Sequence, residues 1–265
     1  MQVIYPVSVS MIATPLKSFT TLRFSGAKTK EFLQGQVTCD MRELKRHGHA
    51  SLAACCDHRG RMIANFWVVQ YHDDVLFILP SSVADTVKTH LQKFAMFSKV
   101  TIQIDAQFYI AEAFDVFNLH EHHHDTVFIT LPTANRFLVL AQSNPFSDVT
   151  PNEEESLWRL HNVHDHLCVL YPETSLLFTP HMISLEKLGG VSFQKGCYVG
   201  QEIVARTEYL GKTKRHIHQQ TLLTDHPIQP GDPLKNNKDE TIGVIVEAVK
   251  QPDNTYAILA VVQDA

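Results

Sequence analysis

Short apolar runs of strand length recur along the chain and are separated by turn residues. Runs of this kind, rich in β-branched and aromatic residues, predict β-strands. In the first part of the chain they occupy residues 20–25, 50–57, 61–71, 75–79, 100–104, 108–114, 126–131 and 136–141.

Three other segments show helical features. Residues 27–34 end at Gly35, a residue typical of a helix C-terminus. Residues 81–94 place apolar side chains at helical spacing after a serine cap. A third helix is expected from Thr150, which forms a capping box with Glu153, to about residue 167.

From Arg215 onward the pattern is β-rich, with strands expected at 216–223, 242–249 and 255–262 between proline-containing turns. Strands that cluster on both sides of a helix indicate an α+β protein with antiparallel sheet. We therefore expect an α+β domain over residues 1–212, made of two subdomains, and a small C-terminal β-barrel or sandwich over residues 213–265.

Composition adds few constraints on function. The chain has 265 residues, 44% of them hydrophobic and 19% charged, which is typical of a globular protein. Its formal net charge of −5 gives no general reason to expect nucleic-acid binding. Five cysteines without a C-x-x-C pair argue against a disulfide framework or a common zinc site. The chain shows no secretory signal and no membrane-spanning apolar run, so we expect a cytoplasmic protein without a membrane partner.

One segment concentrates chemically informative residues. Residues 188–211 hold five of the 11 glycines, and among them residues 195–202 spell KGCYVGQE. A thiol two residues from a lysine is a candidate for a lowered pKa, since a nearby cation stabilises thiolate, so Lys195 would favour a reactive Cys197. The alternative is that Cys197 packs as a small apolar residue in a tight turn.

This segment resembles the signature K-G-C-Y-x-G-Q-E of the YgfZ family of folate-binding proteins, which is related to the T-protein of the glycine cleavage system. Residues 33–40 (LQGQVTCD), 54–62 (ACCDHRGRM) and 94–100 (FAMFSKV) resemble three further elements of that family. The matches sample the chain from about Phe19 to Gly211, and the eight-residue signature is highly specific.

The resemblance implies a folate-binding, aminomethyltransferase-like fold of two intertwined subdomains with a C-terminal antiparallel β-barrel. It implies tetrahydrofolate as the ligand, iron–sulfur assembly or client proteins as partners, and an indirect effect on tRNA modification. Cys197 and Lys195 take the catalytic positions. The ligand-binding positions fall on Phe19, where the family usually has Trp, and on Trp158, Tyr198, Gln201 and Glu202, and the basic residue Arg206 just downstream is added as a candidate for an anionic group of the ligand.

Two positions depart from the related aminomethyltransferases. Where those enzymes carry an Asp pair, this chain has Ala64 and Asn65, and an amide cannot take a proton as a carboxylate does. Where relatives often place Glu, this chain has His164. The leading hypothesis is therefore a tetrahydrofolate-binding accessory protein of iron–sulfur maturation, and the alternative is a folate-dependent aminomethyltransferase.

Weaker signals allow other interpretations. His161, His164, Asp165 and His166 lie close together in sequence, yet the chain has 16 histidines and one helix end does not define a metal site, so no metal is expected. The basic residues Lys212, Lys214 and Arg215, with Arg206 upstream, favour either an anion such as a folate tail or tRNA phosphate, or a solvated domain boundary.

Overall fold

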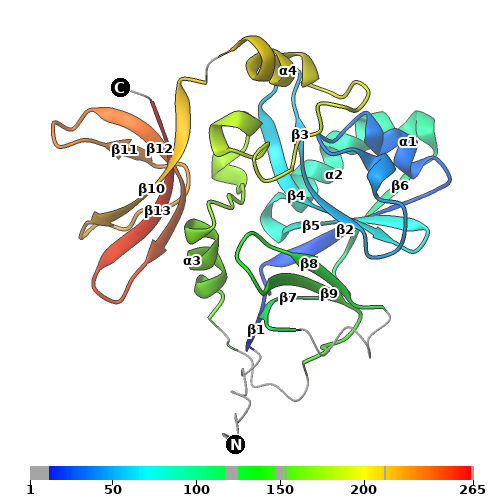
Figure 1. Ribbon diagram of the computed structural model, residues 1–265, viewed down its shortest axis with the longest axis horizontal. Helices are drawn as coiled ribbons and strands as arrows, with labels where there is room; N and C mark the ends of the chain where they lie inside the picture. Colours follow the sequence, from blue (N-terminus) through cyan, green and yellow to red (C-terminus); the bar gives the residue numbers. More distant parts are fainter. Residues whose placement is uncertain (1–11, 117–124, 147–151, 153, 212, 264–265) are drawn as a thin grey trace, which may run out of the picture.

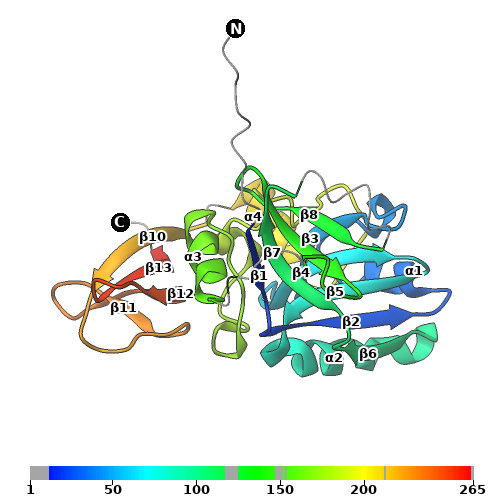
Figure 2. The same ribbon diagram turned by 90° about the horizontal axis from the view of Figure 1, so that it is seen from below.

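The computed structural model describes residues 12–116, 125–146, 152, 154–211 and 213–263. These residues form three antiparallel sheets, with the helix α3 (Ser156–His164) between the C-terminal sheet and the two N-terminal sheets (Figure 1; Figure 2). The α+β class expected from the sequence is confirmed. No helix in the described ranges is long and apolar enough to cross a membrane.

The largest sheet has five strands in the order β3-β4-β5-β2-β6. The strands are β2 (Phe19–Ser25), β3 (Ala50–Cys56), β4 (Met62–Tyr71), β5 (Asp74–Pro80) and β6 (Thr101–Asp105). The central strands β4 and β5 are buried on both faces, which explains their nearly continuous apolar sequences. All five strands match runs expected from the sequence.

Helices cover one face of this sheet. α2 (Ser81–Ala95) buries Val83, Val87 and Leu91, which pack with Phe24 and Phe77 in one apolar cluster. The helix α1 (Thr29–Gln34) contributes Phe32 and Leu33 to the same cluster. Both helices were expected from the spacing of their apolar residues. Short 3₁₀ turns η1 (Met41–Glu43) and η2 (Met96–Ser98) follow α1 and α2.

The second sheet has the order β1-β7-β9-β8. It contains β1 (Ile12–Pro15), β7 (Tyr109–Phe114), β8 (Val127–Thr130) and β9 (Arg136–Ala141). The sequence analysis did not predict β1, a four-residue strand that ends in proline. Only three residues separate β1 from β2, so consecutive strands belong to different sheets. The chain thus passes from the second sheet to the first between β1 and β2, as expected for two intertwined subdomains.

The C-terminal sheet has the order β10-β13-β12-β11 and contains β10 (Arg215–Leu223), β11 (Pro233–Lys235), β12 (Thr241–Lys250) and β13 (Thr255–Gln263). The expected barrel is not closed, because no described pairing joins the outer strands β10 and β11. The sheet adds Val246 and Leu259 to the central core, and alternate residues of the same strands, among them Ile245 and Ile258, form a separate apolar cluster. The boundary at residue 213 stays a prediction.

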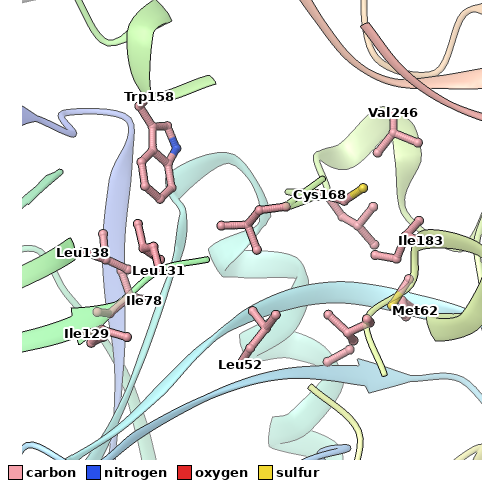
Figure 3. Close-up of a cluster of buried hydrophobic side chains, with 14 of the residues drawn as sticks. Leu52, Met62, Ile78, Ile129, Leu131, Leu138, Trp158, Cys168, Ile183 and Val246 are labelled. Atoms are coloured by element: carbon pink, nitrogen blue, oxygen red, sulfur yellow. The ribbon is translucent and has the colours of Figure 1, made fainter. Parts of the chain in front are cut away.

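The central core joins all three sheets around α3. Trp158 is 1% exposed and packs in a cluster that includes Leu138 of the second sheet, Ile78 of the first and Val246 of the third (Figure 3). The helix begins at Ser156 and ends at His164, so the expected end near residue 167 is three residues too late. Thr150 and Glu153, the expected capping box, lie outside the described residues.

A long connection leads from α3 to α4 (Gln201–Leu210) and contains the 3₁₀ turns η3 (Pro172–Thr174) and η4 (Pro180–Ile183). It carries residues 195–202 toward the top of the view in Figure 1, where α4 lies above β3.

Candidate functional site

Residues 195–200 form a loop that leads directly into α4. Gly200 is the N-cap of this helix, with φ +84°, a backbone conformation that favours glycine. Gln201 and Glu202 occupy the first turn of the helix, and Cys197 lies three residues before its N-cap. We call residues 195–200 the signature loop.

Residues 35–40 hold the signature loop in place through backbone hydrogen bonds. The N–H of Val199 donates to the carbonyl of Gly35 at 3.3 Å, and the N–H of Ser192, just before the loop, donates to Thr38 at 2.9 Å. The Thr38 hydroxyl donates to the carbonyl of Gly190 at 2.5 Å. Two segments far apart in the sequence, each expected from the family resemblance to matter, therefore form one structural unit.

Lys195 is the main side-chain link between these segments. Lys195 is 7% exposed, and its ammonium donates hydrogen bonds to the carbonyls of Val37 at 2.6 Å and Cys39 at 2.7 Å. Burial lowers the pKa of Lys195 to about 8. The ammonium also lies 5.1 Å from the ring centroid of Tyr198. No described contact joins it to Cys197, so Lys195 acts here on the backbone of residues 37–39 rather than on that thiol.

Tyr198 faces inward from the loop. It is 7% exposed, and its hydroxyl is buried without a hydrogen-bond partner among the described residues. Burial raises the pKa of this phenol well above its ordinary value.

Cys197 faces the opposite way. It is exposed, whereas Cys39, Cys55, Cys56 and Cys168 are buried. Exposure excludes the alternative in which Cys197 packs as a small apolar residue. Cys197, Gln201 and Glu202 line a cavity of about 530 Å³ together with His58 from the turn between β3 and β4. Arg206 lies further along α4, exposed and outside this cavity.

The buried thiols differ chemically from Cys197. Burial raises the pKa of Cys39 to about 11 and of Cys55 to about 12. It raises the pKa values of Cys56 and Cys168 as well. A thiol with a raised pKa is protonated and unreactive at neutral pH. Cys55 and Cys56 end the buried strand β3, as the sequence analysis expected.

Phe19 and Trp158 form a separate aromatic site where the sheets meet α3. Their rings pack edge to face with centroids 5.8 Å apart. Both line a small cavity of about 10 Å³, together with Asn65. The indole N–H of Trp158 is buried and has no hydrogen-bond partner among the described residues. A buried indole N–H usually has a partner, so this donor is available to a ligand.

Asn65 is committed to the backbone of this site. Its amide donates to the carbonyl of Cys168 at 2.7 Å and accepts from the N–H of Leu170 at 2.9 Å. Asn65 is buried, so these two bonds fix its side chain. The Asn65 side chain therefore holds residues 168–170, which follow α3, and is not a proton acceptor.

An ionic cluster behind Trp158 was not expected from the sequence. Arg136 is fully buried, lies 4.9 Å from the Trp158 ring centroid, and pairs with Glu112 at 2.5 Å and with Asp165. His161 contacts Glu112 at 3.0 Å. Two of the four residues considered above as a possible metal site, His161 and Asp165, are therefore already engaged in this cluster. The only sequence signal was a charged residue within each of two strand-like apolar runs.

The signature loop and the aromatic site share no cavity. No residue that lines the cavity beside Cys197 also lines the one between Phe19 and Trp158. The structure thus brings together the residues of the signature loop, and separately Phe19 with Trp158, but does not join the two groups.

The chain is similar to several characterised proteins. A tRNA-modifying protein YgfZ from Sodalis glossinidius (strain morsitans) is 30% identical over 94% of this chain and 84% of its own length. The proteins of that name from Escherichia coli O6:K15:H31 and Colwellia psychrerythraea are 30% and 27% identical over 94% and 93% of the chain, and over 84% and 83% of their own lengths. No family model matches the chain.

The fold is similar to that of a solved enzyme. The crystal structure of the glycine cleavage system aminomethyltransferase T from Bartonella henselae superposes with a TM-score of 0.71. The superposition covers 96% of this chain and 78% of the enzyme, with 14% sequence identity. The aminomethyltransferase-like fold expected from the sequence is thereby confirmed.

Proposed function

The chain belongs to the YgfZ family, and on this premise we propose that it is a cytoplasmic folate-binding protein that supports tRNA modification. In this proposal tetrahydrofolate binds at Phe19 and Trp158, and Cys197 acts at an exposed surface toward protein partners. The family membership supports the tRNA part. The aromatic site supports the folate part.

The unpaired indole N–H of Trp158 is the observation that carries the folate proposal. It is a buried hydrogen-bond donor of a residue that lines a mostly apolar cavity beside a second aromatic ring, Phe19. A pterin is a flat heterocycle with ring nitrogens and a carbonyl, so it satisfies such a donor and packs on aromatic faces. The residues present therefore fit the ligand in chemistry.

Access to Trp158 depends on Phe19. The cavity between the two rings, about 10 Å³, is far smaller than a pterin. Phe19 also lines a cavity of about 550 Å³ on the side of Lys17 and Phe108. A rotation of the Phe19 side chain would join these two spaces, and we propose that folate enters from the larger one.

Folate, when bound, supplies a carrier for one-carbon units. Nothing in the geometry of Asn65 favours aminomethyl transfer, because this buried amide is held by two backbone hydrogen bonds and offers no carboxylate. We therefore propose an accessory role rather than the alternative enzymatic one.

We assign the exposed Cys197 to a contact or redox step with iron–sulfur client or assembly proteins. Lys195 positions its loop, Tyr198 anchors the loop in the interior, and Gln201 and Glu202 line the adjoining groove. Arg206 is assigned to an anionic group of the ligand or partner. An effect on tRNA then follows through iron–sulfur enzymes that modify it.

Titration of tetrahydrofolate under anaerobic conditions tests the folate site. Wild type, Trp158→Phe and Phe19→Ala are compared by calorimetry, with Phe97→Ala as a control because Phe97 is 89% exposed. Trp158→Phe keeps an aromatic ring and removes the N–H, so we expect about tenfold weaker binding. We expect Phe19→Ala to alter the rate of binding as well as the affinity.

Equal affinity in wild type and in both aromatic variants would move the folate site elsewhere. Far-ultraviolet circular dichroism of each variant confirms that the fold is retained, so that a loss of binding is assigned to the site.

A further inference from the structure

A second cavity lies on the other side of the turn that carries His58. Its volume is about 570 Å³, and it opens between the turn after β3 and one end of the C-terminal sheet. Its lining includes Arg59 and Arg61 from the turn and Arg215 from the start of β10. Residues far apart in sequence thus place three arginines in the lining of one cavity, which we call the arginine cleft.

The arginine cleft has an excess of positive charge. Among the described residues of its lining, Asp57 is the one acidic residue against three arginines, so these four residues carry a formal charge of +2 in a chain whose net charge is −5. Oδ1 of Asp57 already accepts hydrogen bonds from the backbone N–H groups of Arg59 and Arg61, both at 2.9 Å. Within the described part of the chain, no carboxylate forms an ion pair with Arg59, Arg61 or Arg215.

One hydrogen bond holds the Arg61 side chain at the wall of the cleft. Its guanidinium donates to the carbonyl of Leu177, which borders the same cleft. The turn itself is closed by a hydrogen bond from the N–H of Asp57 to the carbonyl of Arg61 at 2.8 Å. A preorganised cation of this kind binds an anion with a smaller loss of conformational entropy than a free surface side chain.

The apolar part of the lining defines the rest of the ligand. Leu176, Leu177 and Ile242 are 47%, 38% and 36% exposed, and they lie beside the polar side chains of Thr241 and Gln263. A cavity of this volume suits a small organic molecule rather than a bare ion. The ligand therefore combines an anionic group with a partly apolar, hydrogen-bonding body.

Charge and geometry select phosphate as the anionic group. A terminal phosphate carries close to two negative charges and three acceptor oxygens, which match the charge of the cleft and its three guanidinium groups. A carboxylate carries half that charge and two oxygens. Guanidinium forks also bind phosphate oxygens in pairs.

We propose that the arginine cleft, formed by Arg59, Arg61 and Arg215, binds a nucleoside phosphate, with the phosphate on the guanidinium groups and the nucleoside over Leu176, Leu177 and Ile242. The nucleoside phosphate is either a free mononucleotide or the 5′-terminal nucleotide of an RNA chain, since both carry a terminal phosphate. Because Phe19 and Trp158 are not part of the cleft, this proposal does not depend on folate binding.

The cleft and the thiol are neighbours across one turn. His58 lines the cavity beside Cys197, whereas Asp57, Arg59 and Arg61 line the arginine cleft. A nucleotide bound in the cleft thus contacts the same turn that the signature loop packs against.

Calorimetric titration of the full chain with nucleoside 5′-monophosphates and with inorganic phosphate tests the proposal. We compare wild type with the double variant Arg59→Ala/Arg215→Ala, whose altered side chains are both exposed. Arg59→Lys keeps the charge and loses the paired hydrogen bonds. Lys250→Ala removes one exposed charge at the far end of β12 and is the matched control.

We expect a mononucleotide to bind wild type and Lys250→Ala with a Kd below about 1 mM, and the double variant at least tenfold more weakly. Arg59→Lys should fall between them, and inorganic phosphate should compete. Absence of mononucleotide and tRNA binding, or equal affinity in the double variant, overturns the proposal.

A second arm distinguishes the two sources of the ligand. If tRNA binds wild type, weakens steeply with salt and is displaced by mononucleotide, the cleft receives a nucleotide of RNA. If mononucleotide alone binds, the ligand is a free nucleotide. Tetrahydrofolate titration of the double variant is expected to match wild type, so failure of either proposal is recognised separately.

Discussion

Gly200 lies directly against Gly60, and both hold a positive φ, +84° and +71°. A Cβ at Gly200 would lie 2.5 Å from the carbonyl oxygen of Asp57 and 3.0 Å from Cα of Gly60. The signature loop and the β3–β4 turn therefore approach each other as closely as two backbones allow. This contact holds the turn whose residues line both the cavity beside Cys197 and the arginine cleft.

We predict that Gly200→Ala destabilises the protein by about 3 kcal/mol or more, since the new methyl group meets backbone as well as an unfavourable φ. Gly189→Ala is the control: its φ is +75°, but no atom lies within 4 Å of the added Cβ. It should cost only about 1 kcal/mol. Urea unfolding measures both, and equal losses would show that the contact with Gly60 contributes nothing.

Gly196 gives a complementary test. It has no positive φ, and nothing lies within 4 Å of a Cβ added there. We predict that Gly196→Ala changes stability by less than about 0.5 kcal/mol. If this variant folds normally yet loses function in cells, the glycine is required for the approach of a ligand or partner and not for the fold.

Thiol labelling should distinguish Cys197 from the other cysteines. We predict that at pH 8 iodoacetamide modifies one thiol of the native protein rapidly, because the buried thiols are inaccessible and their pKa values are raised. Mass spectrometry of peptides should place the label on Cys197, and Cys197→Ser should abolish it. Rapid labelling of Cys39 or Cys168 in the native protein would contradict the structure.

A second substitution at the same position tests the role of the thiol. Cys197→Ala should leave the unfolding midpoint nearly unchanged, since the side chain is exposed, but should fail to complement an iron–sulfur or tRNA-thiolation defect. Full complementation by this variant would remove the thiol from the proposed function.

The buried Lys195 should make stability depend on pH. Its pKa is lowered from 10.5 to about 8, so between these values the unfolded chain binds a proton that the folded protein has released. The free energy of unfolding of wild type, relative to Lys195→Met, should therefore rise as pH increases from 8 to 10. Comparison with the variant is needed because cysteine ionisation in the unfolded chain acts in the opposite direction over the same range.

Lys250→Met is the control for this experiment. Lys250 is exposed at the end of β12, so its difference from wild type should stay flat with pH. A flat profile for Lys195→Met as well would mean that the ammonium is solvated rather than held by Val37 and Cys39.

Arg136 is predicted to be the most important charged residue for stability. Arg136→Leu should cost about 3–5 kcal/mol, because Glu112 and Asp165 lose a buried partner. Arg23 also bridges two carboxylates, Asp74 and Asp105, but its side chain is 28% exposed. Arg23→Leu should cost about 1 kcal/mol or less, as measured by urea unfolding. Similar losses of unfolding free energy in the two variants would contradict this prediction and indicate that Arg136 is solvated.

Sequence patterns predicted elements whose apolar spacing is local. The strand at residues 136–141 and the helix from Ser81 match the structure within a residue, because burial imposes the period directly on the sequence. The strand β1 was missed, since four residues ending in proline carry too little pattern. The open C-terminal sheet was predicted as a barrel because closure depends on where a face packs, which local sequence does not encode.

The site was predictable only in part. Cys197 and Lys195 were identified from a motif, but spacing suggested that the ammonium serves the thiol, whereas Lys195 binds the carbonyls of Val37 and Cys39. Both carbonyls lie more than 150 residues away from Lys195 in sequence. The ion pair of Arg136 with Glu112 and the convergence of three arginines on one cleft likewise depend on tertiary contacts.

The short connection between β1 and β2 limits how the molecule can open. Three residues join a strand of the second sheet to a strand of the first, and a chain of that length spans roughly 10–14 Å between the flanking residues at full extension. The connection therefore acts as a tether beside Phe19, and the ends of the two strands cannot separate by more than this distance. Next to this tether, a molecule that reaches Trp158 gains access through rearrangement of side chains such as Phe19 rather than through separation of the two strand ends.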